Sequence, residues 1–591
     1  MLGREKKWFI KNKVADFKVI SKCYGISEII ARLIVNRDIK SNEELETYLY
    51  PTLEHMHNPL LMKDMDKACD LLVQKIQEKR KIRIVGDYDV DGVMATYILH
   101  EGLKRCGANI DLEIPERIKD GYGINISIIE AAYEEGVDTI ITCDNGISAL
   151  EQIKRAKELG MTVIITDHHD IPFIQEENQR VYVVPEADAV VNPKQADQAY
   201  PYDSICGAVV ALKLIQVMYN KYKIEEEESN KFLEFAAIAT VCDVMDLKNE
   251  NRVIVKNGLE RLQNTRNVGL RALMEETQIT DKKIGVYHLG FIIGPCINAS
   301  GRLESAKLGL SLFMEKDPSE AKKMANQLRE LNDERKNMTN NGLAEAVDKL
   351  ESTNLAQDKV IVVYLPECHE SIAGIIAGRI KERYHKPAIV LTKSSHGVKG
   401  SARSIEEYNM FEELNRCKEL LTKFGGHPMA AGLSLGEESI DELRQTLNRN
   451  TVLTEDDLME KVSFDMILSL NQINYNLIHE ISLLEPYGKG NAKPLFVLRH
   501  VKVMKAIVLG KNRNVLRLTI VEENNTNRYT AMIFNDIELF EQTVVEKYGK
   551  DQLEAIYSGR QSKVTLDIVF YPEINEYNGI QNIQIMVQHY R

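Results

Sequence analysis

Residues 81–92 read KIRIVGDYDVDG, an apolar strand pattern that runs directly into a turn with three aspartates. Two later stretches repeat the arrangement, because VDTIITC (137–143) precedes Asp144 and MTVIIT (161–166) precedes DHHD (167–170). Nearly unbroken apolar strands that alternate with helical segments are typical of a parallel sheet covered on both faces. We therefore predict an α/β fold whose first lobe is built on these strands.

Amphipathic segments separate the strands. They cover residues 92–106, 126–135 and 147–159, and each is followed by a glycine, a common residue at helix C-termini. In an open parallel sheet the loops after the strands converge on one crevice, and ligands bind there. The three acidic loops are therefore expected to lie together at one edge of the sheet.

The pattern changes along the rest of the 591-residue chain. The expected domains are a helical N-terminal region (1–80), a catalytic domain (81–250), a helical connector (251–350), a second α/β domain (351–465) and a C-terminal domain (466–591). A polar–apolar periodicity over residues 303–350 predicts a long helix that joins the two α/β lobes. The short alternating strands after residue 465 suggest a small β-barrel similar to an OB-fold.

Composition limits the class of protein. With 44% hydrophobic and 28% charged residues, the chain is typical of globular proteins, and no apolar run reaches the roughly 18–20 residues that span a bilayer. Nine cysteines without C-x-x-C spacing favour reduced thiols and a cytoplasmic location. The net charge of −13 does not exclude a nucleic-acid partner, since a binding groove needs only local positive charge.

The acidic loops suggest a metal site. Several carboxylates within a few ångströms either take up protons or hold a cation. Aspartate oxygens combined with the imidazoles of the DHHD segment, without thiolates, suit Mn²⁺ or Mg²⁺. Two such ions can catalyse the hydrolysis of a phosphoester. In the alternative interpretation, an aspartate after a strand only caps the next helix, and DHHD is a solvated turn.

Four segments resemble, in order, the motifs of the DHH phosphoesterase superfamily: IVGDYDVDG (84–92), TCDNGI (142–147), TDHHD (166–170) and ATVCDVMD (239–246). The resemblance implies two ions, Mn²⁺ or Mg²⁺, with Asp144 as the bridge between them. The implied metal ligands are Asp87, Asp89, Asp144, His168 and Asp243. His169 is expected beside them, and it completes the implied catalytic set. Arg83 stands where several relatives have a histidine, which predicts fewer protein ligands for one ion.

Three later segments are rich in Gly, Ser and Arg: PCINASGRL (295–303), KGSARSI (399–405) and FGGHPMAAG (424–432). Small residues let a ligand approach the backbone closely, and arginine binds phosphate through two parallel hydrogen bonds. In the alternative interpretation, KGSARS is an ordinary surface loop and FGGHPMAAG is a strand–turn–helix junction with a structural histidine.

These segments resemble the DHH-associated second domain, which implies contacts with the substrate. The implied residues are Arg302, Ser401, Arg403, Gly425, Gly426, His427, His369 and Arg379. The last two match a family segment in CHESIAGIIAGRI (368–380), although Cys368 and Ser371 replace the usual Trp and Gly. A further match, IPERIKDGYGIN (114–125), has no implied role.

The resemblance extends over nearly the whole chain, including the C-terminal barrel, and this extent favours the RecJ-type exonucleases of the superfamily. It implies 5′→3′ hydrolysis of single-stranded DNA to mononucleotides in DNA repair and recombination. It also suggests a single-strand-binding protein or a helicase as partner, and no membrane. The residues alone indicate neither the polarity nor a preference for DNA over RNA.

Two other functions are considered. A phosphodiesterase for short oligonucleotides or cyclic dinucleotides would share the metal site, but such substrates need no barrel to bind a long strand. A non-catalytic scaffold for single-stranded nucleic acid would not need the intact set of acidic residues.

Overall fold

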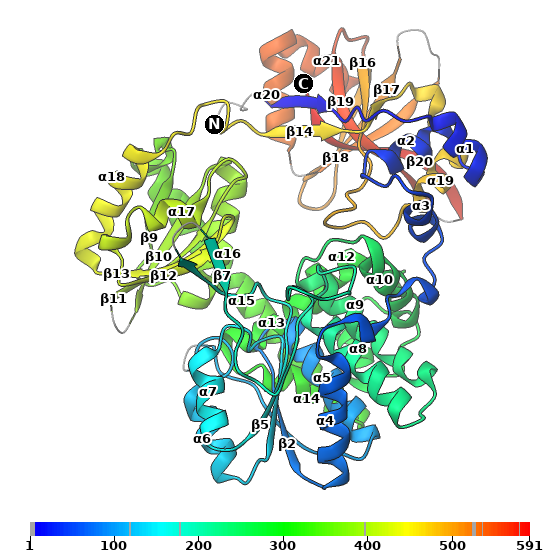
Figure 1. Cartoon of the computed structure of the whole chain (residues 1–591). Helices are drawn as coiled ribbons and strands as arrows, with labels where there is room; N and C mark the ends of the chain where they lie inside the picture. The colour runs from blue at the N-terminus through cyan, green and yellow to red at the C-terminus, as the bar shows by residue number, and fades with distance from the viewer. Residues whose placement is uncertain are drawn as a thin grey trace. The chain divides into compact units, whose positions relative to one another are not determined.

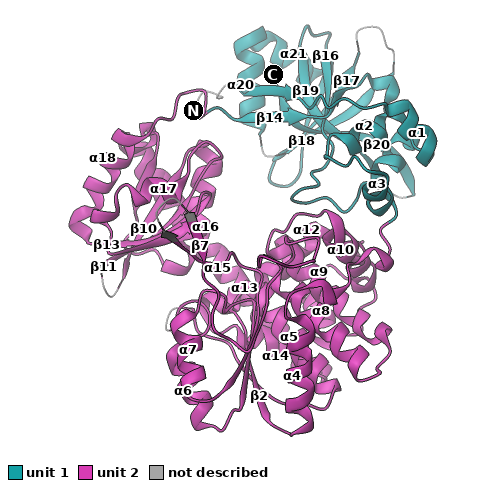
Figure 2. Cartoon of the chain, viewed as in Figure 1, with its two compact units in different colours: residues 1–50, 459–591 teal, residues 51–458 magenta. Residues whose placement is uncertain are grey.

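The computed structural model describes residues 6–117, 120–176, 179–394, 397–522, 527–534, 536–577 and 579–591. The chain divides into two compact units, shown in Figures 1 and 2. Unit 1 comprises residues 1–50 and 459–591, and unit 2 comprises residues 51–458. Within the described part of the chain, no helix is long and apolar enough to cross a membrane.

The first lobe of unit 2 is built on a five-stranded parallel sheet, as the strand patterns predict. Its order is β3 (Asn109–Glu113), β2 (Lys81–Val85), β4 (Thr139–Cys143), β5 (Thr162–Thr166) and β8 (Ala189–Val191). The three inner strands, β2, β4 and β5, are almost completely buried because helices cover both faces of the sheet.

The helices on the two faces form separate cores (Figure 1). One face is covered by α4 (Met65–Gln77), α5 (Val90–Arg105) and α8 (Gly207–Lys221), and the other by α6 (Ile126–Glu134) and α7 (Leu150–Glu158). Successive residues of a strand point to opposite faces, so Ile84 belongs to the first core and Val85 to the second. A short hairpin of β6 (Phe173–Glu176) and β7 (Gln179–Tyr182) follows the DHHD segment.

The helices after residue 230 extend the first core and lead to the second lobe. They are α9 (Leu233–Cys242), α10 (Asn249–Leu262), α11 (Val268–Glu276), α12 (Val286–His288), a π-helical turn (Leu289–Ile293), α13 (Gly294–Leu303), α14 (Lys307–Met314) and α15 (Pro318–Ser352). The long connecting helix is confirmed as the 35-residue α15, which contributes to the core of each lobe. It starts later than the periodicity suggested, because Asp317 caps a new helix with Pro318 in its first turn.

The second lobe contains a five-stranded mixed sheet. Its order is β12 (Lys423–His427), β13 (Ala430–Leu435), β11 (Gly397–Arg403), β10 (Ala388–Ser394) and β9 (Ile361–Tyr364). One face packs against α16 (Glu370–Tyr384), and the other belongs to the core that contains α17 (Met410–Asn415) and α18 (Ile440–Asn450). KGSARS is thus a strand rather than a surface loop, and FGGHPMAAG is a hairpin rather than a strand–turn–helix junction.

Unit 1 contains the predicted barrel. Strands β16 (Phe496–Leu509), β17 (Val515–Val521), β18 (Tyr529–Phe534), β20 (Ile580–Tyr590) and β19 (Thr565–Tyr577) pair in this order. The barrel closes because β19 also pairs with β16. Helices α20 (Ile537–Tyr548) and α21 (Lys550–Ser558) lie between β18 and β19 in the chain, and β15 (Met466–Ile467) and α19 (Tyr475–Ser482) precede β16.

The N-terminal region is helical except for one strand. Helices α1 (Phe17–Tyr24), α2 (Glu28–Val35) and α3 (Asn42–Leu49) follow β1 (Lys7–Ile10), which pairs in parallel with β14 (Lys461–Phe464). This four-residue strand is too short to give a periodic signal of its own. Residues of α2 share a core with the barrel strands, so residues 1–50 fold together with residues 459–591. The five-part division by domain remains a prediction.

The shared core of unit 1 predicts a stability effect far from the barrel in sequence. Leu33 is fully buried in that core, so Leu33→Ala should lower the free energy of unfolding of unit 1 by about 2–5 kcal/mol. Trp8 is the single tryptophan and lies in unit 1, so tryptophan fluorescence during denaturant unfolding reports this transition. Val19→Ala is the control, because Val19 is 55% exposed. Equal shifts in the two variants would contradict the shared core.

Candidate metal centre

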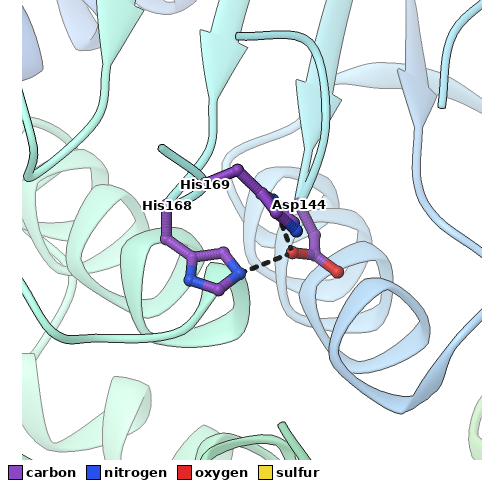
Figure 3. A group of neighbouring side chains, drawn as sticks. All are labelled: Asp144, His168 and His169. Carbon is purple, nitrogen blue, oxygen red and sulfur yellow. Dashed lines mark ion pairs between the residues drawn. The ribbon is translucent and has the colours of Figure 1, made fainter. Parts of the chain in front are cut away.

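The predicted acidic loops meet at the carboxyl edge of the parallel sheet. Asp87 follows β2, Asp144 follows β4, and His168 and His169 follow β5. Asp243 approaches from a different direction, at the C-terminal end of α9. Figure 3 shows the two imidazoles directed toward the Asp144 carboxylate. Convergence of the strand-end loops is therefore confirmed as a matter of geometry.

Distances within the cluster are short. The Nε2 atom of His168 lies 3.0 Å from Oδ1 of Asp144, 3.5 Å from Oδ2 of Asp91 and 3.7 Å from Oδ2 of Asp243. The Nδ1 atom of His169 lies 3.8 Å from the same oxygen of Asp144. These pairs belong to two of the three overlapping groups of possible metal ligands found among the described residues, and the ligand atoms of each group lie within 4.8 Å of one another. The groups are Asp144–His168–His169, Asp91–His168–Asp243 and Asp87–Asp89–Asp144.

Asp144 is held in an unusual backbone conformation. Its φ angle of 59° lies in the left-handed region, which is costly for a residue with a side chain. The hydroxyl of Tyr122 donates a hydrogen bond of 3.0 Å to the carbonyl oxygen of Asp144. The side-chain amide of the next residue, Asn145, donates to the carbonyl oxygens of Val85 and Cys143. A Cβ atom at Gly207 would lie 2.7 Å from Cβ of Asp144, so only glycine fits there.

Three further aspartates organise the loops through backbone hydrogen bonds. Asp91 accepts from the amides of Gly207 and Ala208 at 2.6 and 2.8 Å, which anchors the start of α8 beside the cluster. Asp89 accepts a hydrogen bond of 3.1 Å from a backbone amide of α5 and caps this helix. Asp89 is therefore both a helix cap and a member of the acidic cluster. Asp167 accepts from the amides of its two histidine neighbours and of Ile147, and it fixes the turn at the end of β5.

The electrostatics of the cluster disfavour its charged form. Burial, together with neighbouring carboxylates, raises the pKa of Asp87 and Asp144 well above the usual range. Burial and the charges of Asp91 and Asp89 raise the pKa of Asp243 to about 8. These shifts follow from placing like charges in a poorly solvated site.

His169 and Asp167 behave as a pair. Burial raises the pKa of Asp167, but its hydrogen bond to His169 and the charges of the two imidazoles outweigh burial and lower it to about 2. Burial lowers the pKa of His169, but the same hydrogen bond, at 2.8 Å, and the surrounding carboxylates raise it to about 9.

The residues fit a divalent metal on the evidence of their unpaired atoms. Among the described residues, one carboxylate oxygen each of Asp87 and Asp144 and both ring nitrogens of His168 are buried without a hydrogen bond of good geometry, although Nε2 of His168 lies 3.0 Å from Oδ1 of Asp144. A buried polar atom without a partner is costly, and coordination to a cation would satisfy these atoms. Oxygen and imidazole donors without thiolate suit Mn²⁺ and Mg²⁺. Which of these residues bind the metal remains a prediction.

Arg83 takes no part in the cluster. Its guanidinium donates two hydrogen bonds of 2.8 Å to Asp111 and a third to Glu135. It is thus bound to carboxylates on neighbouring elements at the middle of β2, away from the strand end that carries Asp87.

Arginines gather next to the carboxylates, and the charge of Arg117 partly offsets the raised pKa of Asp87. The pKa of Arg302 falls to about 10 because of burial and the positive charges of Arg117, Arg335 and Arg403. The Nη1 atom of Arg302, on α13, donates to the carbonyl of Ser371 at the start of α16 and so links the two lobes of unit 2. Cations held together against their mutual repulsion form a site that an anion would stabilise.

The predicted substrate residues of the second lobe lie on its sheet. Ser401 and Arg403 lie on β11, and Gly425, Gly426 and His427 lie on β12. Gly426 has a φ of 147°, and a Cβ there would lie 2.4 Å from the carbonyl oxygen of Ala430. His427 is exposed. The pKa of Asp170 is lowered mainly by its hydrogen bond with Lys194 and to a smaller extent by the charge of His427, so His427 faces the rim of the first lobe.

His369 and Arg379 lie on or beside α16 and have more local contacts. His369 caps α16 and contacts the Ser371 hydroxyl through Nδ1 at 2.7 Å. Burial is the main cause of the lowered pKa of Arg335, and the charge of Arg379 lowers it further. Arg379 therefore lies near the arginine group. Contact of these two residues with the substrate remains a prediction.

Sequence reasoning assigned no role to several residues that the structure brings to the site, among them Tyr122, Arg117 and Tyr88. Tyr122 contacts Asp144 and His169, and the guanidinium of Arg117 lies 5.1 Å from the ring centre of Tyr88. Tyr122 and Arg117 both fall within the segment IPERIKDGYGIN, and Tyr88 lies between two of the predicted ligands. The recurrence of this segment in relatives was the one signal that could have found Tyr122 and Arg117.

Comparison with known proteins identifies the class. Residues 81–240 match the N-terminal domain of the DHH family, residues 357–452 match the DHHA1 domain, and residues 464–589 match the RecJ OB domain. The fold and the metal-fitting cluster are therefore those of a metal-dependent hydrolase of the DHH class.

Relatives define the family within this class. The chain is 34% identical to the single-stranded-DNA-specific exonuclease RecJ of Bacillus subtilis over 100% of its own length and 71% of the relative. It is 31% identical to the RecJ exonuclease of Haemophilus influenzae, over 95% of its own length and 96% of the relative. The structure resembles that of RecJ in complex with Mn²⁺ from Thermus thermophilus, with a TM-score of 0.80 and 25% sequence identity. The match covers 99% of this chain and 79% of the Thermus chain. The chain belongs to the RecJ family.

The raised pKa values predict that metal uptake releases protons. In the metal-free protein Asp243, with a pKa of about 8, is mostly protonated at neutral pH, and burial raises the pKa of Asp87 and Asp144 as well. A metal ion binds the deprotonated form, so Mn²⁺ affinity should rise as the pH is raised from about 6 to above 8. Titration calorimetry at about pH 7 in two buffers of different ionisation enthalpy measures the protons released. Equal heats in the two buffers would contradict the raised pKa values.

Proposed function

We propose that this chain is an exonuclease that hydrolyses phosphodiester bonds of single-stranded DNA with Mn²⁺ or Mg²⁺. The observation that carries the proposal is the buried carboxylate–imidazole cluster with unpaired donor atoms, placed next to a group of arginines. Carboxylates alone would repel a nucleic acid, and arginines alone would only bind it. The two together favour hydrolysis of a bound phosphodiester.

The chain's own residues would act in separate parts of the reaction. Asp87, Asp89, Asp144, His168 and Asp243 would hold a pair of divalent ions, which would supply an activated water and stabilisation of the leaving oxygen. Tyr122 holds the loop of Asp144 in place, because its hydroxyl donates a hydrogen bond to the backbone carbonyl oxygen of Asp144. Arg302 and Arg403 bind and orient the phosphate, and His427 and Ser401 support it from the sheet of the second lobe.

Several finer features are part of the proposal. We expect 5′→3′ polarity, release of mononucleotides and a role in DNA repair and recombination. A single-strand-binding protein or a helicase is the expected partner. All nine cysteines are free thiols, which supports a reducing compartment such as the cytoplasm. The closed barrel of unit 1 favours long strands over the small substrates of an oligonucleotide or cyclic-dinucleotide phosphodiesterase.

The test of the proposed function uses end-labelled oligonucleotides with Mn²⁺. The wild-type chain should degrade single strands and spare duplexes, and the size of the labelled product shows the polarity. Asp144→Asn should lower the rate by about 10²-fold or more, because it removes a charge shared by two of the ligand groups. Lys393→Ala, an exposed change on β10, is the matched control and should keep the wild-type rate. Near-normal turnover of Asp144→Asn would refute the metal-site assignment.

The arginine group predicts a division between phosphate binding and metal binding. Arg403→Ala should weaken the binding of single-stranded DNA about 10- to 100-fold, since it removes charge-assisted hydrogen bonds to phosphate. Mn²⁺ uptake by the same variant, measured by calorimetry, should stay at the wild-type level. Arg444→Ala controls for a general effect of losing an arginine from this lobe, because Arg444 pairs with Asp358 on another surface. Loss of Mn²⁺ uptake in Arg403→Ala would contradict the division.

A further inference from the structure

The second lobe contains a cavity that extends beyond the residues discussed so far. It has a volume of about 420 Å³ and lies over strands β10, β11, β13 and β12. Tyr88 and Arg117 of the first lobe line it at one side, together with Ser401 and Gly425. Lys399 and Lys423 line it as well, and the proposed function gives neither a role.

The pairing register arranges the face of this sheet in parallel rows. Arg403, Ala430 and His427 form one cross-strand row on β11, β13 and β12. Two residues further along each strand, on the same face, Ser401, Gly432 and Gly425 form the next row. The middle row has almost no side chain, so it leaves a trough that continues away from Arg403.

The third row carries polar groups on all four strands. Thr392, Lys399, Ser434 and Lys423 are consecutive partners across β10, β11, β13 and β12. All four line the cavity. Two hydroxyls and two ammonium groups in one row, all able to donate hydrogen bonds, form a surface for an anion.

An unpaired buried atom in this row indicates that a ligand is missing. Thr392 is fully buried, and its Oγ1 atom has no hydrogen-bond partner among the described residues. A buried hydroxyl without a partner costs stability unless something binds it. Because Thr392 lines the cavity, a ligand there can satisfy it.

The charge of the cavity favours an anion although the chain as a whole is acidic. Three cations line it, Arg117, Lys399 and Lys423, against one carboxylate, Glu370. Glu370 pairs with Lys399 at 2.9 Å and therefore neutralises part of that charge. Lys423 is the cation best placed to meet a ligand, since it is exposed at the edge strand of the sheet.

We propose that the row of Thr392, Lys399, Ser434 and Lys423 is a second phosphate subsite. It takes a phosphoryl group farther from the metal cluster than the phosphate bound by Arg403. The backbone rows of Arg403 and Lys399 lie two spacings of about 6.8 Å apart along the strands, and the long arginine and lysine side chains reach over the trough between them. This placement rests on the proposed function. The phosphoryl group comes from a strand end that carries a triphosphate, or from a free polyphosphate.

The first experiment tests the subsite without any hydrolysis. Calorimetry in EDTA measures the binding of inorganic tripolyphosphate to the full-length chain. Lys423→Ala should raise the Kd about tenfold or more, whereas Lys393→Ala, on β10 but on the opposite face, should leave it unchanged. An unchanged Kd in Lys423→Ala would overturn the proposal.

Thr392→Val distinguishes a ligand-binding hydroxyl from a structural one. The variant keeps the shape of the side chain and removes the unpaired oxygen, so its Tm should stay the same or rise. Its Kd for tripolyphosphate should nevertheless rise about threefold or more. A lower Tm with an unchanged Kd would show a structural role and overturn the proposal.

The second experiment distinguishes the two sources of the phosphoryl group. Single strands with a 5′-hydroxyl, a 5′-monophosphate and a 5′-triphosphate are bound to the wild type and to Lys423→Ala in EDTA. Tighter wild-type binding of the triphosphate strand, lost in Lys423→Ala, assigns the subsite to the strand end. Equal binding of the three strands, with tripolyphosphate binding that still depends on Lys423, assigns it to free polyphosphate. Neither experiment measures hydrolysis. If the exonuclease assay failed, the two binding experiments would therefore still decide whether the second phosphate subsite exists.

Discussion

The burial of like charges around Asp144 is the constraint on which the first lobe depends. Carboxylates from two strand-end loops and one helix end meet in a poorly solvated space, and their pKa values rise because burial, and then mutual repulsion, disfavours the charged forms. Such a cluster persists only if the backbone around it is held firmly. The sheet beneath it is covered on both faces, and hydrogen bonds from Tyr122, Asn145 and the start of α8 fix the loops above it.

Opposite charges lie side by side in unit 2. The arginines repel one another as the carboxylates do, and burial intensifies the effect, as the lowered pKa of Arg302 shows. In the proposed function, a phosphodiester held between divalent ions and the arginines would relieve both repulsions together. This arrangement reconciles a net charge of −13 with the proposed nucleic-acid substrate, because positive charge is concentrated beside the candidate metal centre.

The rows of the second-lobe sheet show how a strand register becomes a binding surface. Alternation along each strand places Arg403, Ser401 and Lys399 on one face, and the pairing of β11 with β13 and β12 aligns each with its neighbours. Helix α16 packs on this face over β10 and β11, and Glu370, Ser371 and Ala373 of the helix form part of the cavity lining. The shape of the cavity is therefore a consequence of sheet geometry rather than of any one loop.

The sequence by itself determined the strands of the first lobe, the acidic residues at their ends, the long connecting helix and the barrel. These features are local, because hydrophobic periodicity and strand-end position are properties of short segments. Only the tertiary structure decided that β1 joins the C-terminal unit, that KGSARS is a strand, that Arg83 pairs with Asp111, and that Thr392 and Lys423 share a row. Each of these depends on pairing between segments distant in the chain, and no local pattern encodes which partner or register is chosen.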